Sequence, residues 1–121
     1  MTDRQLHEFR WSLQELLNES MTRIEEINSS LRQTYEFCAD ENERGSLEND
    51  KRRLLAQIER ERQTIQEIYQ ALNRIDQGKY GICTACNRQI NPSRLEIFPT
   101  AGFCIKCMQL MEHENRNRAW R

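Results

Sequence analysis

Four of the five cysteines form two Cys-x-x-Cys pairs, Cys83 with Cys86 and Cys104 with Cys107, separated by 17 residues. This spacing is typical of structural zinc sites, because two thiolates from each pair can complete a tetrahedron around one ion at Zn–S distances of about 2.3 Å. Sulfur would then fill all four positions, so none is open to water or substrate. The sequence therefore predicts one structural Zn²⁺ and a non-catalytic C4 zinc finger over residues 79–110.

The alternative chemistry for these cysteines is that of two redox dithiols of thioredoxin type. Neither pair follows a strand in a βαβ pattern, and a module of about 27 residues can scarcely bury enough apolar surface to fold without a metal. Arg88, Arg94 and Lys106 could offset the negative charge of a four-thiolate centre. The fifth cysteine, Cys38, is either a plain free thiol or a redox sensor.

Enzyme chemistry has little support in the sequence. The two histidines, His7 and His113, lie in separate helical segments and have no adjacent nucleophile pattern. The formal net charge of −1 gives no general attraction to DNA phosphates. We therefore expect a protein that is not an enzyme and whose partners are proteins.

The finger is preceded by a first long helix. Thr2 is a plausible N-cap, with Gln5 completing a capping box and Asp3 favouring the positive end of the helix dipole. No Pro or Gly interrupts residues 3–37, which would span roughly 50 Å as a helix. Apolar residues recur at steps of three and four, which predicts one buried stripe: Leu6, Phe9, Leu13, Leu16 or Leu17, Met21, Ile24, Ile27 or Asn28, Leu31 and Tyr35.

A second helix of nearly equal length is predicted from Ser46, as N-cap, to about Gln77, with Gly78 in the left-handed position that ends it. Its apolar residues follow alternating steps of four and three, close to a 3.5-residue period, and Glu61 stands at the one slot that breaks this seam. The apolar members are Leu54, Ile58, Ile65, Ile68, Leu72 and Ile75.

Two equal helices joined by a polar turn predict an antiparallel coiled-coil hairpin over residues 1–78, with its tip at 38–50. The tip holds five acidic residues against one basic residue, and Gly45 could take the positive φ of a tight reversal. Two helices of an ordinary bundle are the alternative, but no other segment is long enough to complete one. A C-terminal helix from about Cys104, with a tail at 111–121, completes a mainly α fold.

Only 37% of the residues are hydrophobic and 31% are charged, which suits an elongated hairpin with one narrow seam. The N-terminus has no apolar run of signal-peptide type, and no segment approaches the roughly 18 apolar residues of a membrane span. We expect a cytoplasmic protein without a membrane contact.

The finger contains four short motifs, Gly-x-Cys-x-x-Cys from Gly81, Arg94-Leu95-Glu96, Pro99-Thr100-Ala101 and Cys104-Ile105-x-Cys107. A long hairpin followed by these motifs resembles the DksA/TraR family of bacterial transcription factors. The resemblance implies a regulator, associated with the stringent response, that binds RNA polymerase directly without DNA sequence recognition. Its coiled-coil tip would enter the secondary channel and alter promoter-complex stability, and we expect it to act as a monomer. The alternative is a zinc-ribbon and coiled-coil adaptor unrelated to RNA polymerase.

The resemblance also assigns residues at the tip. The family pattern Asp-x-x-Asp-x-Ala falls on Asp40, Glu43 and Gly45, so that two acids are kept and the alanine is not. A solvated acidic loop is the alternative for this segment.

Some relatives help the polymerase to bind the alarmone guanosine tetraphosphate through basic residues. The corresponding positions here are Glu67, Phe98 and Met108, none of which can pair with phosphate. We therefore expect weak or no dependence on the alarmone.

Overall fold

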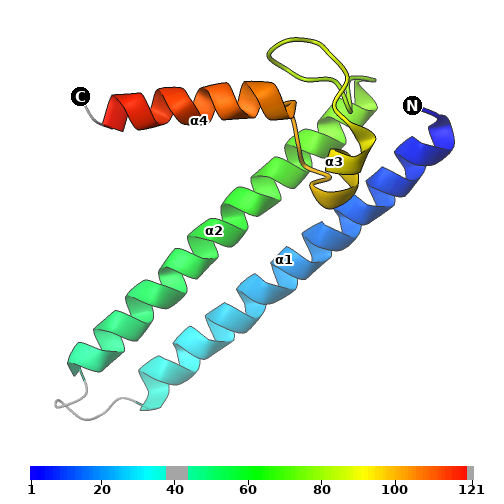
Figure 1. Ribbon diagram of the computed structural model, residues 1–121. Helices are drawn as coiled ribbons and strands as arrows, with labels where there is room; N and C mark the ends of the chain where they lie inside the picture. Colours follow the sequence, from blue (N-terminus) through cyan, green and yellow to red (C-terminus); the bar gives the residue numbers. More distant parts are fainter. Residues whose placement is uncertain (38–43, 120–121) are drawn as a thin grey trace. The chain divides into compact units, whose positions relative to one another are not determined.

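The protein is almost entirely helical. The computed structural model describes residues 1–37 and 44–119 and places them in four helices, α1 (Asp3–Phe37), α2 (Arg44–Asp76), α3 (Pro92–Ile97) and α4 (Ile105–Ala119) (Figure 1). Within these residues there is no strand, and the sole β-type pairing is an isolated bridge between Ile82 and Gln89. None of the described helices is both long and apolar enough to cross a membrane. The prediction of a mainly α fold is confirmed.

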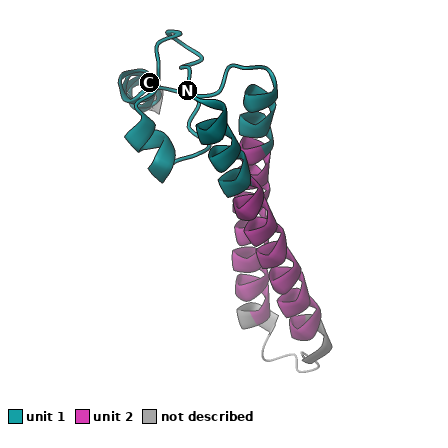
Figure 2. Cartoon of the chain, turned by 90° about the vertical axis from the view of Figure 1, so that its right-hand side faces the viewer, with its two compact units in different colours: residues 1–13, 69–121 teal, residues 14–68 magenta. Residues whose placement is uncertain are grey.

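The chain divides into two compact units, and both long helices contribute to each. One unit is Gln14–Ile68; the other combines Met1–Leu13 with Tyr69–Arg121 (Figure 2). In the first unit the later part of α1 lies antiparallel beside the earlier part of α2, as the sequence predicted for a coiled-coil hairpin.

The seam of the 14–68 unit follows alternating steps of three and four on both helices. Its members are half-buried or buried: Leu17, Ser20, Ile24, Ile27 and Leu31 on α1, and Leu54, Ile58, Glu61, Ile65 and Ile68 on α2. The prediction that Met21 belongs to the stripe is wrong, because Met21 is 41% exposed whereas Ser20 is fully buried. A step of three from Leu17 reaches Ser20, and the helix keeps its 3.5-residue geometry by accepting a small polar residue there.

Ser20 and Glu61 form a polar layer within this apolar seam. Glu61 Oε1 accepts a hydrogen bond from Arg23 Nε at 2.8 Å, and Arg23 Nη2 donates to Ser20 Oγ at 3.3 Å. The other carboxylate oxygen, Glu61 Oε2, is buried without a partner among the described residues. Arg23 thus explains how an acidic residue is tolerated at the one slot that interrupts the α2 seam.

The second helix begins at Arg44, two residues earlier than predicted. Gly45 is therefore part of α2 and not of the reversal, and residues 46–50 of the predicted tip are helical as well. A glycine is compatible with helical φ, and near a helix end it costs little because few intrahelical bonds depend on it. Asp40 and Glu43 lie outside the described residues.

The caps predicted at Thr2 and Gly78 are present, whereas the predicted N-cap Ser46 is wrong, because Ser46 lies inside α2. Gln5 N–H donates to Thr2 Oγ1 at 3.2 Å and Thr2 N–H donates to Gln5 Oε1 at 3.0 Å, which is the reciprocal pair of a capping box. At the end of α2, Gly78 has φ 71°. Its N–H donates to the Ile75 carbonyl and that of Lys79 to the Arg74 carbonyl, at 3.1 and 2.8 Å, the two bonds of a Schellman motif.

The other unit has its own small core, where the start of α1, the end of α2 and the finger meet. Its buried apolar residues are Leu13, Ala71, Ile75, Tyr80, Ile90 and Leu95. At its edge the Phe9 and Tyr80 ring centroids are 5.4 Å apart, and Arg10 Nη2 is 2.8 Å from Asp76 Oδ1. The finger is therefore held to the helix ends by side-chain packing as well as by the chain itself.

The short helix α3 was not predicted, since Asn91-Pro92 and Phe98-Pro99 were interpreted only as turns. Asn91 is its N-cap, with Asn91 Oδ1 accepting from Ser93 N–H at 3.0 Å, and Pro92 is its first residue. Asparagine at the N-cap followed by proline at the first helical position is a recognised helix start, so the sequence did contain this information.

Candidate metal centre

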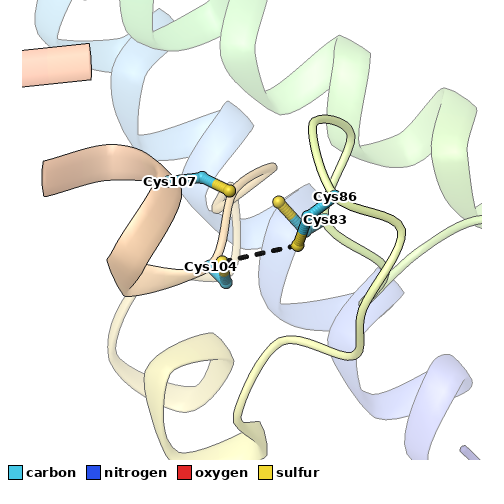
Figure 3. A group of neighbouring side chains, drawn as sticks. All are labelled: Cys83, Cys86, Cys104 and Cys107. Carbon is cyan, nitrogen blue, oxygen red and sulfur yellow. Dashed lines mark hydrogen bonds between the residues drawn. The ribbon is translucent and has the colours of Figure 1, made fainter. Parts of the chain in front are cut away.

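The side chains of the four predicted cysteine ligands form one cluster. The Sγ atoms of Cys83, Cys86, Cys104 and Cys107 all lie within 4.8 Å of one another, and Cys86 Sγ is 3.8 Å from Cys104 Sγ (Figure 3). A regular tetrahedron with Zn–S bonds of about 2.3 Å has edges of about 3.8 Å. The donor set and its spacing therefore fit a single Zn²⁺ with a closed S4 shell.

The first pair is positioned by a tight turn. Cys83 N–H donates to the Arg88 carbonyl at 2.8 Å, and Asn87 N–H donates back to the Cys83 carbonyl at 2.9 Å. Asn87 takes φ 60°, a left-handed conformation that asparagine tolerates better than most residues. The turn fixes where Cys83 and Cys86 lie relative to each other.

The second pair is positioned by α4. Cys104 immediately precedes this helix, and its carbonyl accepts from Met108 N–H at 3.0 Å, while Cys107 lies in the first turn. The two pairs are joined through Thr84, whose N–H and Oγ1 both donate to the Gly102 carbonyl, at 2.9 and 2.6 Å. These bonds connect the segments that carry the two cysteine pairs.

The pKa values of Cys83, Cys104 and Cys107 are shifted in different directions. Burial works against a thiolate at Cys83, but backbone N–H groups of Cys104, Cys86 and Ala85 outweigh it and lower the pKa of Cys83 to about 6. The backbone N–H of Cys107 lowers the pKa of Cys104, whereas side-chain hydrogen bonds to Cys104 and Cys83 raise the pKa of Cys107 to about 12. Without a metal the tetrad thus retains protons that Zn²⁺ must displace.

Among the described residues, this tetrad is the one group of three or more His, Cys, Asp or Glu side chains placed to hold a metal. Of the three bases expected to offset its charge, Arg94 is engaged elsewhere: its Nε donates to the Phe103 carbonyl at 3.3 Å and its Cζ lies 5.7 Å from the centre of the Phe98 ring. These contacts could not be predicted from the sequence, because they depend on backbone atoms and a ring brought together by the fold.

The remaining predicted positions are distributed over several elements. Glu67 is exposed on α2, Phe98 is the C-cap of α3 and 57% exposed, and Met108 is half-buried on α4. The histidines His7 and His113 are exposed on α1 and α4.

Comparison with known proteins places nearly the whole chain within two family models. Residues 5–75 match the model described as "DnaK suppressor protein DksA, N-terminal domain", and residues 78–113 match "Prokaryotic dksA/traR C4-type zinc finger". The second match, together with the tetrad geometry, confirms the prediction of one zinc ion.

Individual relatives agree with the models. The chain is 36% identical over its full length to an RNA polymerase-binding transcription factor DksA of Caulobacter vibrioides, of which it covers 84%. It is 28% identical to the Escherichia coli K12 protein of that name, with 98% of the chain and 79% of the relative covered. The solved structure of transcription factor DksA2 from Pseudomonas aeruginosa superposes with a TM-score of 0.88 at 33% identity, over 96% of this chain and 89% of the other.

Proposed function

Because the chain belongs to the DksA/TraR family, we propose that it is a transcription regulator that binds RNA polymerase directly. The observation that supports this most strongly is that the hairpin matches one family model and the finger matches the other. The names of the relatives also specify RNA polymerase binding. A coiled coil alone would suggest little about function, and a C4 finger alone little more. Their combination in one chain supports this specific role.

The mode of action that we propose is insertion of the hairpin into the secondary channel of the polymerase. Two packed helices measure only about 20 Å across, since each is about 10 Å wide, and such a rod suits a narrow channel. Asp40 and Glu43 would then act near the active centre, where carboxylates can contact basic groups or perturb a metal-coordinated site. Gly45, in the first turn of α2, is the third position of the tip pattern.

The metal has a structural role in this proposal. Cys83, Cys86, Cys104 and Cys107 ligate one Zn²⁺ that closes the finger against the adjoining helix ends, and a closed S4 shell leaves no place for a reacting water. The protein is accordingly not an enzyme. It works as a monomer in the cytoplasm, through the polymerase and not through DNA sequence recognition.

Dependence on guanosine tetraphosphate is weak or absent in this account. The positions where basic residues would be needed to bind phosphate hold other side chains here. They are the acidic Glu67, the aromatic Phe98 and the thioether Met108. Phosphate recognition relies on Lys, Arg or N–H donors, and a carboxylate would repel it.

The test is the lifetime of open complexes formed by purified RNA polymerase at a ribosomal promoter. We expect the wild-type protein to change this lifetime, and the double variant Asp40→Asn/Glu43→Gln to bind the polymerase while losing most of the effect. The matched control Glu19→Gln/Glu25→Gln neutralises two exposed acids of α1 and should retain the effect.

Two outcomes would count against the proposal in different ways. If the tip variant regulates as well as the wild type, the tip assignment fails although RNA polymerase binding stands. If neither protein binds the polymerase, the regulator proposal itself fails and an adaptor role is favoured.

A further inference from the structure

The segment 99–103, which connects α3 to α4 and ends at the ligand Cys104, is held by side chains along almost its whole length. We call it the strap. Four of its five carbonyls accept hydrogen bonds from side chains of other segments: Pro99 from Tyr80 Oη at 2.7 Å, Thr100 from Arg74 Nη2 at 3.1 Å, Gly102 from Thr84 Oγ1 at 2.6 Å and Phe103 from Arg94 Nε at 3.3 Å.

Irregular backbone has no helix or sheet ladder to satisfy its polar groups, so its conformation depends on such partners. Each of these four bonds restricts where the strap can lie. Because the strap leads directly into Cys104 and the first turn of α4, the same bonds restrict where the second cysteine pair can lie. None of the four donor side chains is a cysteine of the tetrad.

Arg74 is the donor that comes from the hairpin helix. It lies in the last turn of α2, nine residues before Cys83, and its side chain is half-buried. A Cβ at Gly102 would lie only 3.4 Å from Arg74 Cζ and Nη1, so the guanidinium packs closely against this glycine while Nη2 binds the Thr100 carbonyl. Arg74 therefore contacts the strap on two sides of Ala101.

Tyr80 reinforces the same attachment. It is only 5% exposed, and burial raises its pKa to about 12, so its hydroxyl remains protonated and able to donate to the Pro99 carbonyl. Arg74 and Tyr80 thus fix adjacent strap residues from the end of α2 and from the segment that follows it.

We propose that Arg74 is a positioning residue for the zinc site, which holds the strap so that Cys104 and Cys107 already face Cys83 and Cys86 before the metal binds. A binding site that is ordered beforehand does not lose conformational entropy when its ligand arrives, so its affinity is higher. The contacts of Arg74 described above are with the strap, so it would act on the ligands through the strap backbone. The inference rests on the tetrad being the zinc site but not on any binding to RNA polymerase.

The experiment measures the affinity of the full-length chain for Zn²⁺ by competition with a fluorescent chelator. The wild type should bind one equivalent. Arg74→Met keeps the aliphatic stem but removes the donors, and should weaken zinc affinity about tenfold, the usual size for one charge-assisted hydrogen bond. Arg62→Met, a change at an exposed arginine on α2, is the matched control and should bind as the wild type does.

A second readout separates positioning from general stability. With Co²⁺ in place of zinc, Arg74→Met should retain the absorption of a tetrahedral thiolate site at saturation, and only its midpoint should shift. Tyr80→Phe, which removes one hydroxyl, should shift the midpoint in the same direction by a smaller factor and provides the test if Arg74→Met does not fold.

The outcomes are distinct. Unchanged metal affinity in Arg74→Met and Tyr80→Phe, even with a lower melting temperature, would overturn the inference, because Arg74 would then stabilise the fold without positioning the ligands. Failure of the wild type to bind one Zn²⁺ would instead refute the metal assignment.

Discussion

Cys83 is completely buried, whereas Cys86, which belongs to the same turn, is exposed. The N–H groups around Cys83 already stabilise its thiolate, so this sulfur is prepared for a metal before one arrives. Cys107 differs, because its hydrogen bonds to neighbouring thiolates hold a proton on it. The four ligands are chemically alike, but their surroundings differ.

Replacing one ligand tests the tetrad directly. We expect Cys83→Ser and Cys107→Ser each to reduce bound zinc from one equivalent to well below one after dialysis, because three thiolates no longer close the tetrahedron. Cys38→Ser, a change at the cysteine outside the tetrad, should keep one equivalent. Metal content by mass spectrometry checks this, and full zinc retention in both tetrad variants would contradict the assignment.

Tyr80 leads to a prediction about alkaline pH. Burial raises its pKa from 10.0 to about 12, and nearby Arg74 opposes only part of this shift. The folded state therefore prefers the neutral phenol, so this stabilisation is complete below pH 10 and is lost as the pH rises from 10 through 12. By pH 11 the wild type should lose about 1 kcal/mol of unfolding free energy through this group.

The comparison variant is Tyr80→Phe, which cannot ionise. Its urea unfolding free energy should lack that part of the decrease between pH 9 and pH 11. Equal losses in both proteins would show that Tyr80 does not titrate with folding.

Among the helices, the seam of the 14–68 unit depends on the ion pair between Arg23 and Glu61, which is only partly exposed to solvent. The Arg23 side chain is 48% exposed and that of Glu61 only 19%, so removing the arginine leaves a mostly buried carboxylate behind. The cost of such an orphaned charge exceeds the net value of the pair itself.

We expect Arg23→Ala to lower the free energy of unfolding by about 1–2 kcal/mol. The double variant Arg23→Ala/Glu61→Leu should recover most of this loss, because leucine continues the apolar seam of α2. Urea denaturation followed by helical circular dichroism measures both, with Arg32→Ala as an exposed control on α1. A double variant less stable than the single one would argue against an orphaned carboxylate.

The helix ends and the finger show which structural features could be predicted from the sequence. Local rules were sufficient for the capping box at Thr2, the left-handed Gly78 and the meeting of the cysteine pairs, because each depends on residues close in sequence or on one metal geometry. Helix α3 could have been predicted from Asn91-Pro92 by the same rules.

Other features depend on residues far apart in the chain. The seam takes Ser20 and not the more apolar Met21, and Arg23 satisfies the serine by donating to its Oγ from the same helix while also donating to Glu61 of the facing helix. Likewise, nothing in the local sequence of Arg74 indicates that its guanidinium packs against Gly102. Hydrophobicity alone does not reveal such polar contacts, since they exist only once the helices and the finger have met.

For the whole molecule, we predict how its regulation responds to guanosine tetraphosphate. Glu67, Phe98 and Met108 offer no side chain that binds phosphate. Adding guanosine tetraphosphate should alter the effect of the protein on open-complex lifetime by less than about twofold, because no charge-assisted phosphate contact is available at these positions. The triple variant Glu67→Lys/Phe98→Arg/Met108→Lys should respond more strongly. Strong synergy between the wild-type protein and the alarmone would contradict this prediction.

The most direct test of the account is equilibrium binding of the purified, zinc-loaded protein to RNA polymerase in the absence of DNA. We expect saturable binding with one molecule per polymerase, retained by Asp40→Asn/Glu43→Gln, because in the proposed mode the hairpin and the zinc finger would contribute contacts besides the tip charges. A protein that is folded and carries one zinc ion but shows no saturable binding would contradict the central claim.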